Sequence, residues 1–312
     1  MTFSAAAMLG VAGAILFLAL VANLFILSVL GRPSHSHAPT ELILIALALV
    51  NAVAGLSNFL WLAVYLLVLC HRLGPWSYQT LDFLILSMAS CSFWFTACLS
   101  TVYCLKVSSI HLPRLIYLQL RLPLIIPRLL PVIFMMGCII ASPTVVFVQL
   151  QVANGTEPHC GDYYEVSRGY EFYLRFFSVF NYMIPWTVQG VSSGGLVFTI
   201  CHHLRAIMAH RMARPATTAH LRVVKTALAL LVLYTICVVM VQVSDSLYIT
   251  TKKDVNWFVA FSFILLAYAV GCPIILIHGT VRLWRELPSL PCVTKDCYHH
   301  TTETGAQPVN LA

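Results

Sequence analysis

The side chains that could do chemistry in this sequence gather near its C-terminal end. Cys292 and Cys297, followed by His299 and His300, offer four potential zinc ligands. Their spacing is not that of a common zinc finger, and we favour lipidation or a tail without fixed structure instead. The chain contains no HExxH, Walker A or GxGxxG motif. We therefore predict that the protein is not an enzyme and has no metal or cofactor site.

The composition predicts a membrane protein. Hydrophobic residues make up 60% of the 312 residues, charged residues make up 9%, and the mean hydropathy is +0.86. A soluble domain has about a quarter of its residues charged. No Asp, Glu, Lys or Arg falls near the middle of the apolar stretches given below, whereas ion-coupled transporters place ionisable groups there. A transporter is therefore disfavoured.

The apolar stretches predict seven transmembrane helices, so the expected fold class is an all-α bundle of seven membrane-spanning helices. The first stretch lacks charge and is too long for a cleavable signal peptide, so we expect it to be retained. We predict a seven-helix domain over residues 1–285 and a short cytoplasmic tail over residues 286–312. The stretches centre on 6–30, 42–69, 81–105, 129–150, 172–201, 224–248 and 257–280, and the breaks on 32–39, 71–75, 111–127, 151–162, 205–215 and 250–254.

The distribution of charge predicts the orientation of the chain. The side that holds the C-terminus carries 13 Lys and Arg and the other side carries 5, so the positive-inside rule places the N-terminus outside. With the acidic residues included, the inner face is +9 and the outer face −2. The glycosylation sequon at Asn154 falls on the predicted outer side. Seven spans in this orientation resemble the layout of a G-protein-coupled receptor.

Several polar residues and two prolines lie within the predicted spans. Pro185 and Pro273 each remove a backbone hydrogen bond, so we expect kinks there. The polar side chains are expected first of all to form hydrogen bonds between helices. They are Asn23, Asn51, Asn58, Asn181, Gln189 and Gln242.

The stretch 99–107 carries a family resemblance. Its sequence LSTVYCLKV, with Arg121 fifteen residues after Lys106, resembles the LSxxYxLKI signature of the bitter taste receptors, the type 2 taste receptor family. Shorter matches extend the resemblance along most of the chain. They are Asn23 to Ile26 (GNxFI), Ile45 to Ala48 (TALA), His220 to Lys225 with Tyr234 (AHxxxxK, then LLLY), His203, and Ala267-Tyr268 with Leu276-Ile277.

The chain also departs from the family pattern. Asn51 stands where the family has an Arg, and Cys272-Pro273 stands where it has His-Ser. We therefore interpret the chain as a divergent member and do not transfer the activation switch in detail. The vomeronasal type 1 receptors, which share the architecture, are the nearest alternative, and a seven-helix transporter is a more distant one.

The resemblance implies a multi-pass receptor of the plasma membrane that detects small, mostly apolar bitter compounds. The ligand would bind between the helices at 81–105, 172–201, 224–248 and 257–280. Ile85 stands where family members often have a Trp, which favours apolar over flat aromatic ligands. By helical spacing and position, the candidate pocket residues are Ile85, Met88, Ala89, Ser92, Phe93, Tyr173, Phe177, Asn181, Val241, Ser244, Phe258 and Ser262.

The resemblance also implies a heterotrimeric, gustducin-like G protein as the partner on the inner face. Basic residues are needed there for topology in any case, so Tyr103 and Lys106, which lie inside the matched motif, are the strongest candidates. The full set of G-protein-facing candidates is Tyr103, Lys106, Arg121, His203, Arg205, His220, Arg222 and Lys225.

The cysteine positions allow one disulfide at the outer face but do not require it. Of the 11 cysteines, most lie in or near spans and are expected to act as small apolar packing residues. Only Cys70 and Cys160 are placed to meet at the oxidising outer face, and their positions allow either a disulfide or two free thiols. The helix at 81–105 has no cysteine near its outer end, so the disulfide usual in many receptors of this architecture is not expected.

Overall fold

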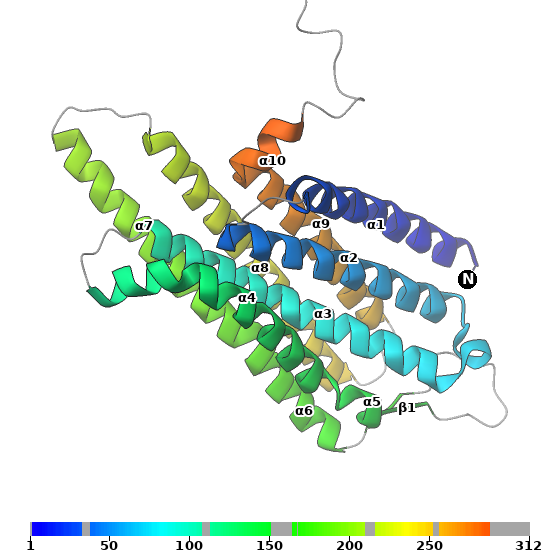
Figure 1. The fold of residues 1–312 in the computed structure, drawn as a ribbon. Helices are drawn as coiled ribbons and strands as arrows, with labels where there is room; N and C mark the ends of the chain where they lie inside the picture. The colour runs from blue at the N-terminus through cyan, green and yellow to red at the C-terminus, as the bar shows by residue number, and fades with distance from the viewer. Residues whose placement is uncertain are drawn as a thin grey trace, which may run out of the picture.

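The computed structural model describes residues 2–32, 38–107, 113–150, 164–166, 168–209, 216–251 and 256–287. Helices form nearly all of this part of the chain (Figure 1). The elements are α1 (Thr2–Leu30), α2 (Pro39–Leu66), α3 (Cys70–Val107), α4 (Pro113–Ala141), α5 (Thr144–Phe147), β1 (Val148–Leu150), β2 (Tyr164–Val166), α6 (Arg168–Ser178), the π-helix η2 (Val179–Met183), α7 (Ile184–Ala209), α8 (Ala216–Thr251), α9 (Asn256–Gly279) and α10 (Val281–Glu286).

Six helices of the described part are long and apolar enough to cross a membrane. The seventh predicted span corresponds to α6, η2 and α7 together, which follow one another without a gap. Its apolar character is interrupted by Gln189 and by the small residues 192–195. The six spans are Ser4–Leu30, Pro39–Leu66, Trp76–Val107, Ile116–Val146, Leu221–Ser244 and Val259–Gly279.

The segment between the third and fourth spans differs from the prediction. Residues 111–127 were expected to form a break, but α4 already begins at Pro113. Pro123, Pro127 and Pro131 lie inside this helix, spaced four residues apart, and all three are exposed. Residues four apart share one face of a helix, so the missing N–H groups and the rings fall on the outer side, away from the packing interface.

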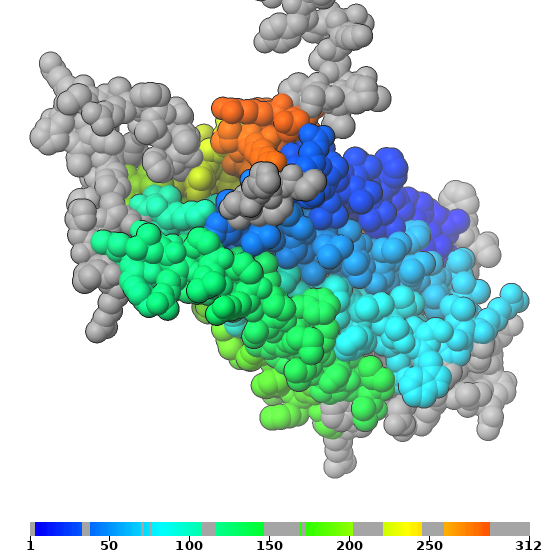
Figure 2. Space-filling view, viewed as in Figure 1, coloured from blue at the N-terminus to red at the C-terminus, as the bar shows by residue number. Residues whose placement is uncertain are grey.

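α3 is the most buried of the six spans and α4 the least. α3 packs against α2, α4 and α7, while α9 packs against α8, α1 and α2. Gly137 allows α4 to approach α3, because a Cβ atom there would lie 2.7 Å from Cys91 Sγ. α2 and α4 form much of the surface beside α3 in the space-filling view (Figure 2).

Local sequence explains how several helices begin and bend. Pro39 occupies the first turn of α2, where its missing N–H is not needed. Glu41 then accepts a hydrogen bond from the Ala38 N–H at 3.3 Å. α3 contains a break at Gly74, whose φ of 75° favours glycine. The break separates a short first turn from the membrane-spanning part of α3.

Two short strands, β1 and β2, follow α5 in the chain. β1 and β2 pair in antiparallel register, with Val148 opposite Val166 and Leu150 opposite Tyr164. β1 lies toward the end of the bundle opposite α10 (Figure 1). This hairpin lies on the side where the sequence analysis places the outer face.

Candidate functional site

A proline creates the irregular point around which the site is built. Pro185 has no N–H, so the carbonyl of Asn181, four residues earlier, loses its helical partner. The helix widens here into η2, a kind of irregularity that is frequent at functional sites. The Tyr234 hydroxyl of α8 lies 3.2 Å from the Asn181 carbonyl and 3.1 Å from the Tyr182 carbonyl, and these two acceptors share its single proton. Pro185 thus follows a π-helix that is tied to α8, and Pro273 lies inside α9. The kinks expected at these two prolines stay predictions.

Phe93 lies at the centre of an aromatic cluster that joins four elements. Its ring stacks on Tyr234 of α8, with centroids 4.7 Å apart and planes at 17°. It meets the edges of Tyr182 of η2 at 5.4 Å and Tyr268 of α9 at 5.0 Å. All four side chains are buried. Edge-to-face and stacked contacts of this kind are the favoured aromatic geometries, so Phe93 holds α3, η2, α8 and α9 at one point.

Hydrogen bonds between helices surround the aromatic cluster, as the sequence predicted for the intramembrane asparagines. Ser92 Oγ donates to Asn51 Oδ1 at 2.6 Å, which connects α3 to α2. Ser90 Oγ donates to Asn181 Oδ1 at 2.5 Å, which connects α3 to η2. The hydroxyls of Thr96 and Tyr268 lie 3.0 Å apart. These bonds satisfy the side-chain oxygens of Asn51 and Asn181, which would be costly to leave unpaired in the membrane interior. The Nδ2 atoms of both residues are buried and have no hydrogen-bond partner among the described residues.

Other polar residues behave differently. Asn58 Nδ2 donates to the Ser262 carbonyl at 2.7 Å, which connects α2 to α9. Asn23 donates to the Ala19 carbonyl of its own helix, contrary to the expectation of a bond between helices. Gln242 bonds Ser178. The amide atoms of Gln189 are buried and have no hydrogen-bond partner among the described residues.

A small cavity lies beside this cluster, between α2, α3 and α9. Its volume of about 20 Å³ is enough for one water molecule. Four of the candidate pocket residues line it: Ile85, Ala89, Ser92 and Phe93. The remaining lining residues are Asn51, Ala54, Leu265, Tyr268 and Ala269. Asn51 and Tyr268 were missed as cavity residues, although the sequence singled out Asn51 as an intramembrane polar residue.

The other candidate pocket residues also face the bundle interior. Tyr173 donates its hydroxyl to the Ile140 carbonyl at 2.9 Å and packs on the Phe177 ring at 5.9 Å. Ser244 donates to the Met240 carbonyl of its own helix. The side chain of Phe258 lies outside the described residues. The candidates with described side chains are all buried: Ile85, Met88, Ala89, Ser92, Phe93, Tyr173, Phe177, Asn181, Val241, Ser244 and Ser262.

One catalytic-type pattern occurs in the chain and does not form a catalytic site. The residues GVSSG at 190–194 match GxSxG, which acts as a nucleophile elbow only at a sharp turn between a strand and a helix. Here the pattern lies within α7. Ser192 Oγ lies 3.0 Å from Thr101 Oγ1, and this contact connects α7 to α3. The serines therefore serve helix packing.

The end predicted to be cytoplasmic carries the residues of the matched motif. Tyr103 packs against the cluster of Leu196, Ile200 and Ala227. Lys106 is exposed, and its Nζ donates to Thr40 Oγ1 at 3.4 Å. Lys106 therefore presents its charge at the surface between α2 and α3.

The other basic candidates at this end have different surroundings. Arg121 is exposed and lies over the Tyr117 ring at 4.4 Å from the ring centre. Arg222 and Lys225 line a pocket between α8 and α9. The remaining candidates with side chains outside the described residues are His203, Arg205 and His220.

Three further predictions fall on parts that the structure does not describe. The sequon at Asn154 and Cys160 lie outside the described residues, as does the side chain of Cys70. Glycosylation and the disulfide therefore stay predictions. The cysteines and histidines of the C-terminal tail also lie outside the described residues.

Six long apolar helices and the continuous segment of α6, η2 and α7 make a seven-helix bundle, and the family match makes this bundle a G-protein-coupled receptor. Residues 2–293 match the family described as taste receptor protein (TAS2R). The chain therefore belongs to the TAS2R family of bitter taste receptors, which confirms the resemblance seen at residues 99–107. The match decides between the families left open above, in favour of the taste receptors. The chain is thus a multi-pass membrane receptor and not an enzyme.

The similar proteins are distant relatives. Taste receptor type 2 member 41 of Rattus norvegicus is 25% identical over 288 residues, which cover 85% of this chain and 89% of that protein. Member 134 of the same species is 26% identical over 258 residues, covering 77% and 73%. Member 143, also of Rattus norvegicus, is 29% identical over 147 residues, so the alignment spans 45% of this chain and 50% of that protein.

Proposed function

We propose that this receptor detects small, mostly apolar bitter compounds and activates a heterotrimeric, gustducin-like G protein. The observation that carries the proposal is the Phe93 cluster, in which one buried ring joins α3 to η2, α8 and α9. Membership of the TAS2R family supports a bitter compound as the ligand. The buried, apolar candidate residues, such as Ile85 and Met88 on α3, suit a ligand of low polarity.

The ligand acts by shifting an equilibrium between two arrangements of the bundle. It shifts that equilibrium only by the difference between its affinities for the two arrangements. A ligand that displaces Phe93 changes the contact of this ring with Tyr234 on α8. Because Tyr234 also bonds the carbonyls of η2, a shift of α8 requires these bonds to break or to move with it. This gives the pocket a physical connection to the inner end of α8.

The G protein is bound at the inner ends of the helices. Tyr103 and Lys106 are the central contacts in this proposal, since one packs beside α7 and α8 and the other is exposed between α2 and α3. Lys106 keeps a mobile point charge at the surface. The proposed contact region also includes Arg121, His203, Arg205 and His220. Its edge is formed by Arg222 and Lys225.

The proposal is tested by expressing the full chain with a promiscuous or gustducin-like G protein and recording intracellular calcium. We expect responses to some members of a broad library of bitter compounds, with apolar compounds prominent among them. Cells without the receptor are the control. Silence across the library despite confirmed surface expression would contradict the proposal, as would responses only to volatile or steroid-like chemosignals.

The same cells test the inner face through Lys106→Ala. We expect a reduced maximal calcium response at an unchanged surface level, because an exposed charge for the partner is removed. Arg32→Ala is the matched control, because it removes an exposed charge that directly follows α1 at the predicted inner face. Equal responses of the wild type and Lys106→Ala would remove Lys106 from the proposed contact region.

A further inference from the structure

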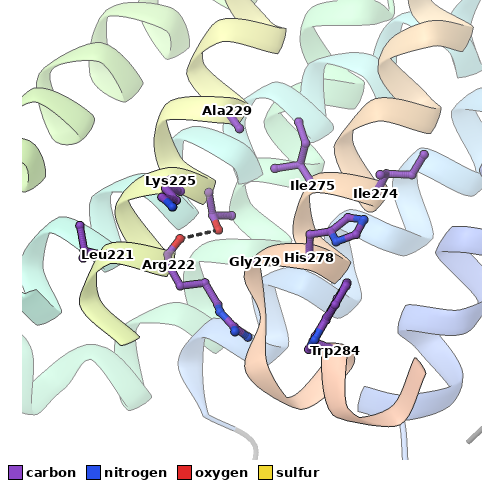
Figure 3. A pocket seen from close by; sticks show the side chains of 10 residues that line it. Leu221, Arg222, Lys225, Ala229, Ile274, Ile275, His278, Gly279 and Trp284 are labelled. Atoms are coloured by element: carbon purple, nitrogen blue, oxygen red, sulfur yellow. Dashed lines mark hydrogen bonds between the residues drawn. The ribbon is translucent and has the colours of Figure 1, made fainter. Parts of the chain in front are cut away.

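A pocket of about 610 Å³ opens between α8 and α9 at the end where α10 begins (Figure 3). Arg222, Lys225 and Thr226 of α8 line one wall, and His278, Gly279 and Trp284 line the other. Neither the Phe93 cluster nor the small cavity beside it shares a residue with this pocket. The pocket is therefore a second hollow, at the opposite end of α8 and α9 from the proposed bitter-compound site.

A close contact between two helices forms the floor of the pocket. A Cβ atom on Gly279 would lie 2.1 Å from Thr226 Oγ1, so only a glycine allows α9 to pass α8 this closely. Thr226 Oγ1 in turn donates to the Arg222 carbonyl at 2.9 Å, shown as the dashed line in Figure 3. The threonine hydroxyl is thus occupied within α8, and the charged side chains are left to face the pocket.

The pocket walls are positively charged. Arg222 is half-buried and extends from α8 toward Trp284, and Lys225 is exposed (Figure 3). The His278 ring lies against the Trp284 ring, with centroids 4.8 Å apart. No carboxylate is among the lining residues, and neither Arg222 nor Lys225 pairs with a carboxylate in the part of the chain that the structure describes. The walls therefore offer several N–H donors and two fixed charges to an anion.

The pocket opens onto the lipid-facing surface of the bundle. Lys225 lies three, seven and eleven residues before Leu228, Val232 and Ile236, which share its face of α8. These three side chains are 39%, 58% and 57% exposed, as expected for contact with lipid. On the opposite wall, Ile274 is 42% exposed. Basic groups at the predicted cytoplasmic end thus continue directly into apolar surface along the helices.

An anion that also carries apolar chains fits this combination. Basic pockets between transmembrane helices on the cytoplasmic side suit lipid head groups, and a Trp at the membrane interface suits the boundary between head group and chains. Arg presents several donors that match a phosphate. We propose that this pocket binds the phosphate head group of an anionic phospholipid of the inner leaflet, with the acyl chains lying along the exposed face of α8.

The proposal is tested on the purified full-length receptor in a neutral detergent. Native mass spectrometry counts bound lipid during titration with dioctanoyl phosphatidylinositol 4-phosphate, with dioctanoyl phosphatidylcholine and inorganic phosphate as parallel probes. We expect the anionic lipid to bind and the zwitterionic lipid to bind at least about tenfold more weakly, because head-group attraction is worth about a factor of five for each basic residue. Inorganic phosphate should not compete at equal concentration.

Variants separate the pocket from the general charge of the inner face. Lys225→Ala should weaken binding of the anionic lipid about fivefold, and Arg222→Ala with Lys225→Ala about 25-fold. Arg285→Ala, which removes an exposed charge from α10, should leave binding within about twofold, because Arg285 does not line the pocket and its exposed charge is screened by water and salt. Since Lys225 is exposed, its single variant should fold even if the double variant does not.

Three outcomes would overturn the proposal. Equal binding of phosphatidylcholine would show that the charges are not used. Competition by inorganic phosphate at equal concentration would show a site for free anions. An equal loss of binding in Lys225→Ala and Arg285→Ala would show that total charge, and not this pocket, attracts the lipid. None of these outcomes depends on whether the receptor responds to bitter compounds.

Discussion

Tyr234 shows how one side chain can compensate for a local defect elsewhere in the chain. Pro185 leaves a carbonyl of η2 without its helical donor, and the Tyr234 hydroxyl, 53 residues away from Asn181, bonds to it. The ring is fully buried and stacks on Phe93. Tyr234 thus makes both the hydrogen bond and the ring stacking. Removing only its hydroxyl separates the two contributions.

We expect Tyr234→Phe to lower the free energy of unfolding by about 1–3 kcal/mol, because two buried carbonyls lose the one donor that they share while the ring stays in place. Thermal unfolding of the purified receptor in nanodiscs measures the change. Tyr117→Phe is the matched control, since Tyr117 is 55% exposed on α4. Pro185→Ala restores the missing N–H, so Tyr234→Phe should cost less in that background. Equal costs in the two backgrounds would contradict this account.

At the scale of elements, α4 shows the limit of local sequence signals. Prolines and charged residues, Pro123, Pro127 and Arg121 among them, indicated a break in residues 111–127. The structure forms a continuous helix, since a backbone in or near a membrane must satisfy its own hydrogen bonds. The prolines are tolerated because they share an exposed face. Arg121 and Arg128 are seven residues apart and also both exposed. The prolines and arginines are compatible with a helix because they all lie on its exposed surface.

The contact between α8 and α9 depends on Gly279. We expect Gly279→Ala to destabilise the receptor by about 1–3 kcal/mol, because the added Cβ overlaps Thr226 and forces the two helices apart. Differential scanning fluorimetry in detergent measures the melting temperature. Gly194→Ala is the matched control, since a Cβ there meets nothing within 4 Å. A melting temperature equally low in both variants, or unchanged in Gly279→Ala, would contradict the close approach.

At the scale of the whole molecule, the distribution of charge predicts how the bundle lies in the membrane. The predicted inner face carries +9 and the predicted outer face −2. The ion pair of Arg282 on α10 with Glu41 on α2, at 2.8 Å, lies at the predicted inner end. Such an exposed pair adds little stability, roughly 0.2–1 kcal/mol. The excess of positive charge therefore serves orientation more than it serves folding.

The orientation predicts that Asn154 carries a glycan on the outer side. Treatment with an N-glycosidase should increase the gel mobility of the receptor expressed in mammalian cells, and Asn154→Gln should abolish this shift. Thr156→Ser keeps the sequon and is the control. A wild-type receptor whose mobility does not change on treatment would contradict use of this sequon, and a shift that persists in Asn154→Gln would place the glycan elsewhere.

The sequence by itself determined the membrane class, most of the spans and the family, and it predicted the orientation. These follow from apolar length, from the placement of Lys and Arg, and from the residues of the 99–107 motif, all of which are local features or simple sums. It also predicted correctly that Asn51, Asn58 and Asn181 bond between helices. It could not name their partners, because a partner is chosen by which helices become neighbours.

Only the tertiary structure decided the partners and the pockets. The ring of Phe93 meets residues 89, 141 and 175 positions later in the chain, and no local pattern predicts such contacts. The basic pocket arises in the same way, since Arg222 and Trp284 line one hollow only because Gly279 lets α9 pass close to Thr226. Close packing of helices creates both sites, and it depends on shapes that become adjacent only when the bundle has formed.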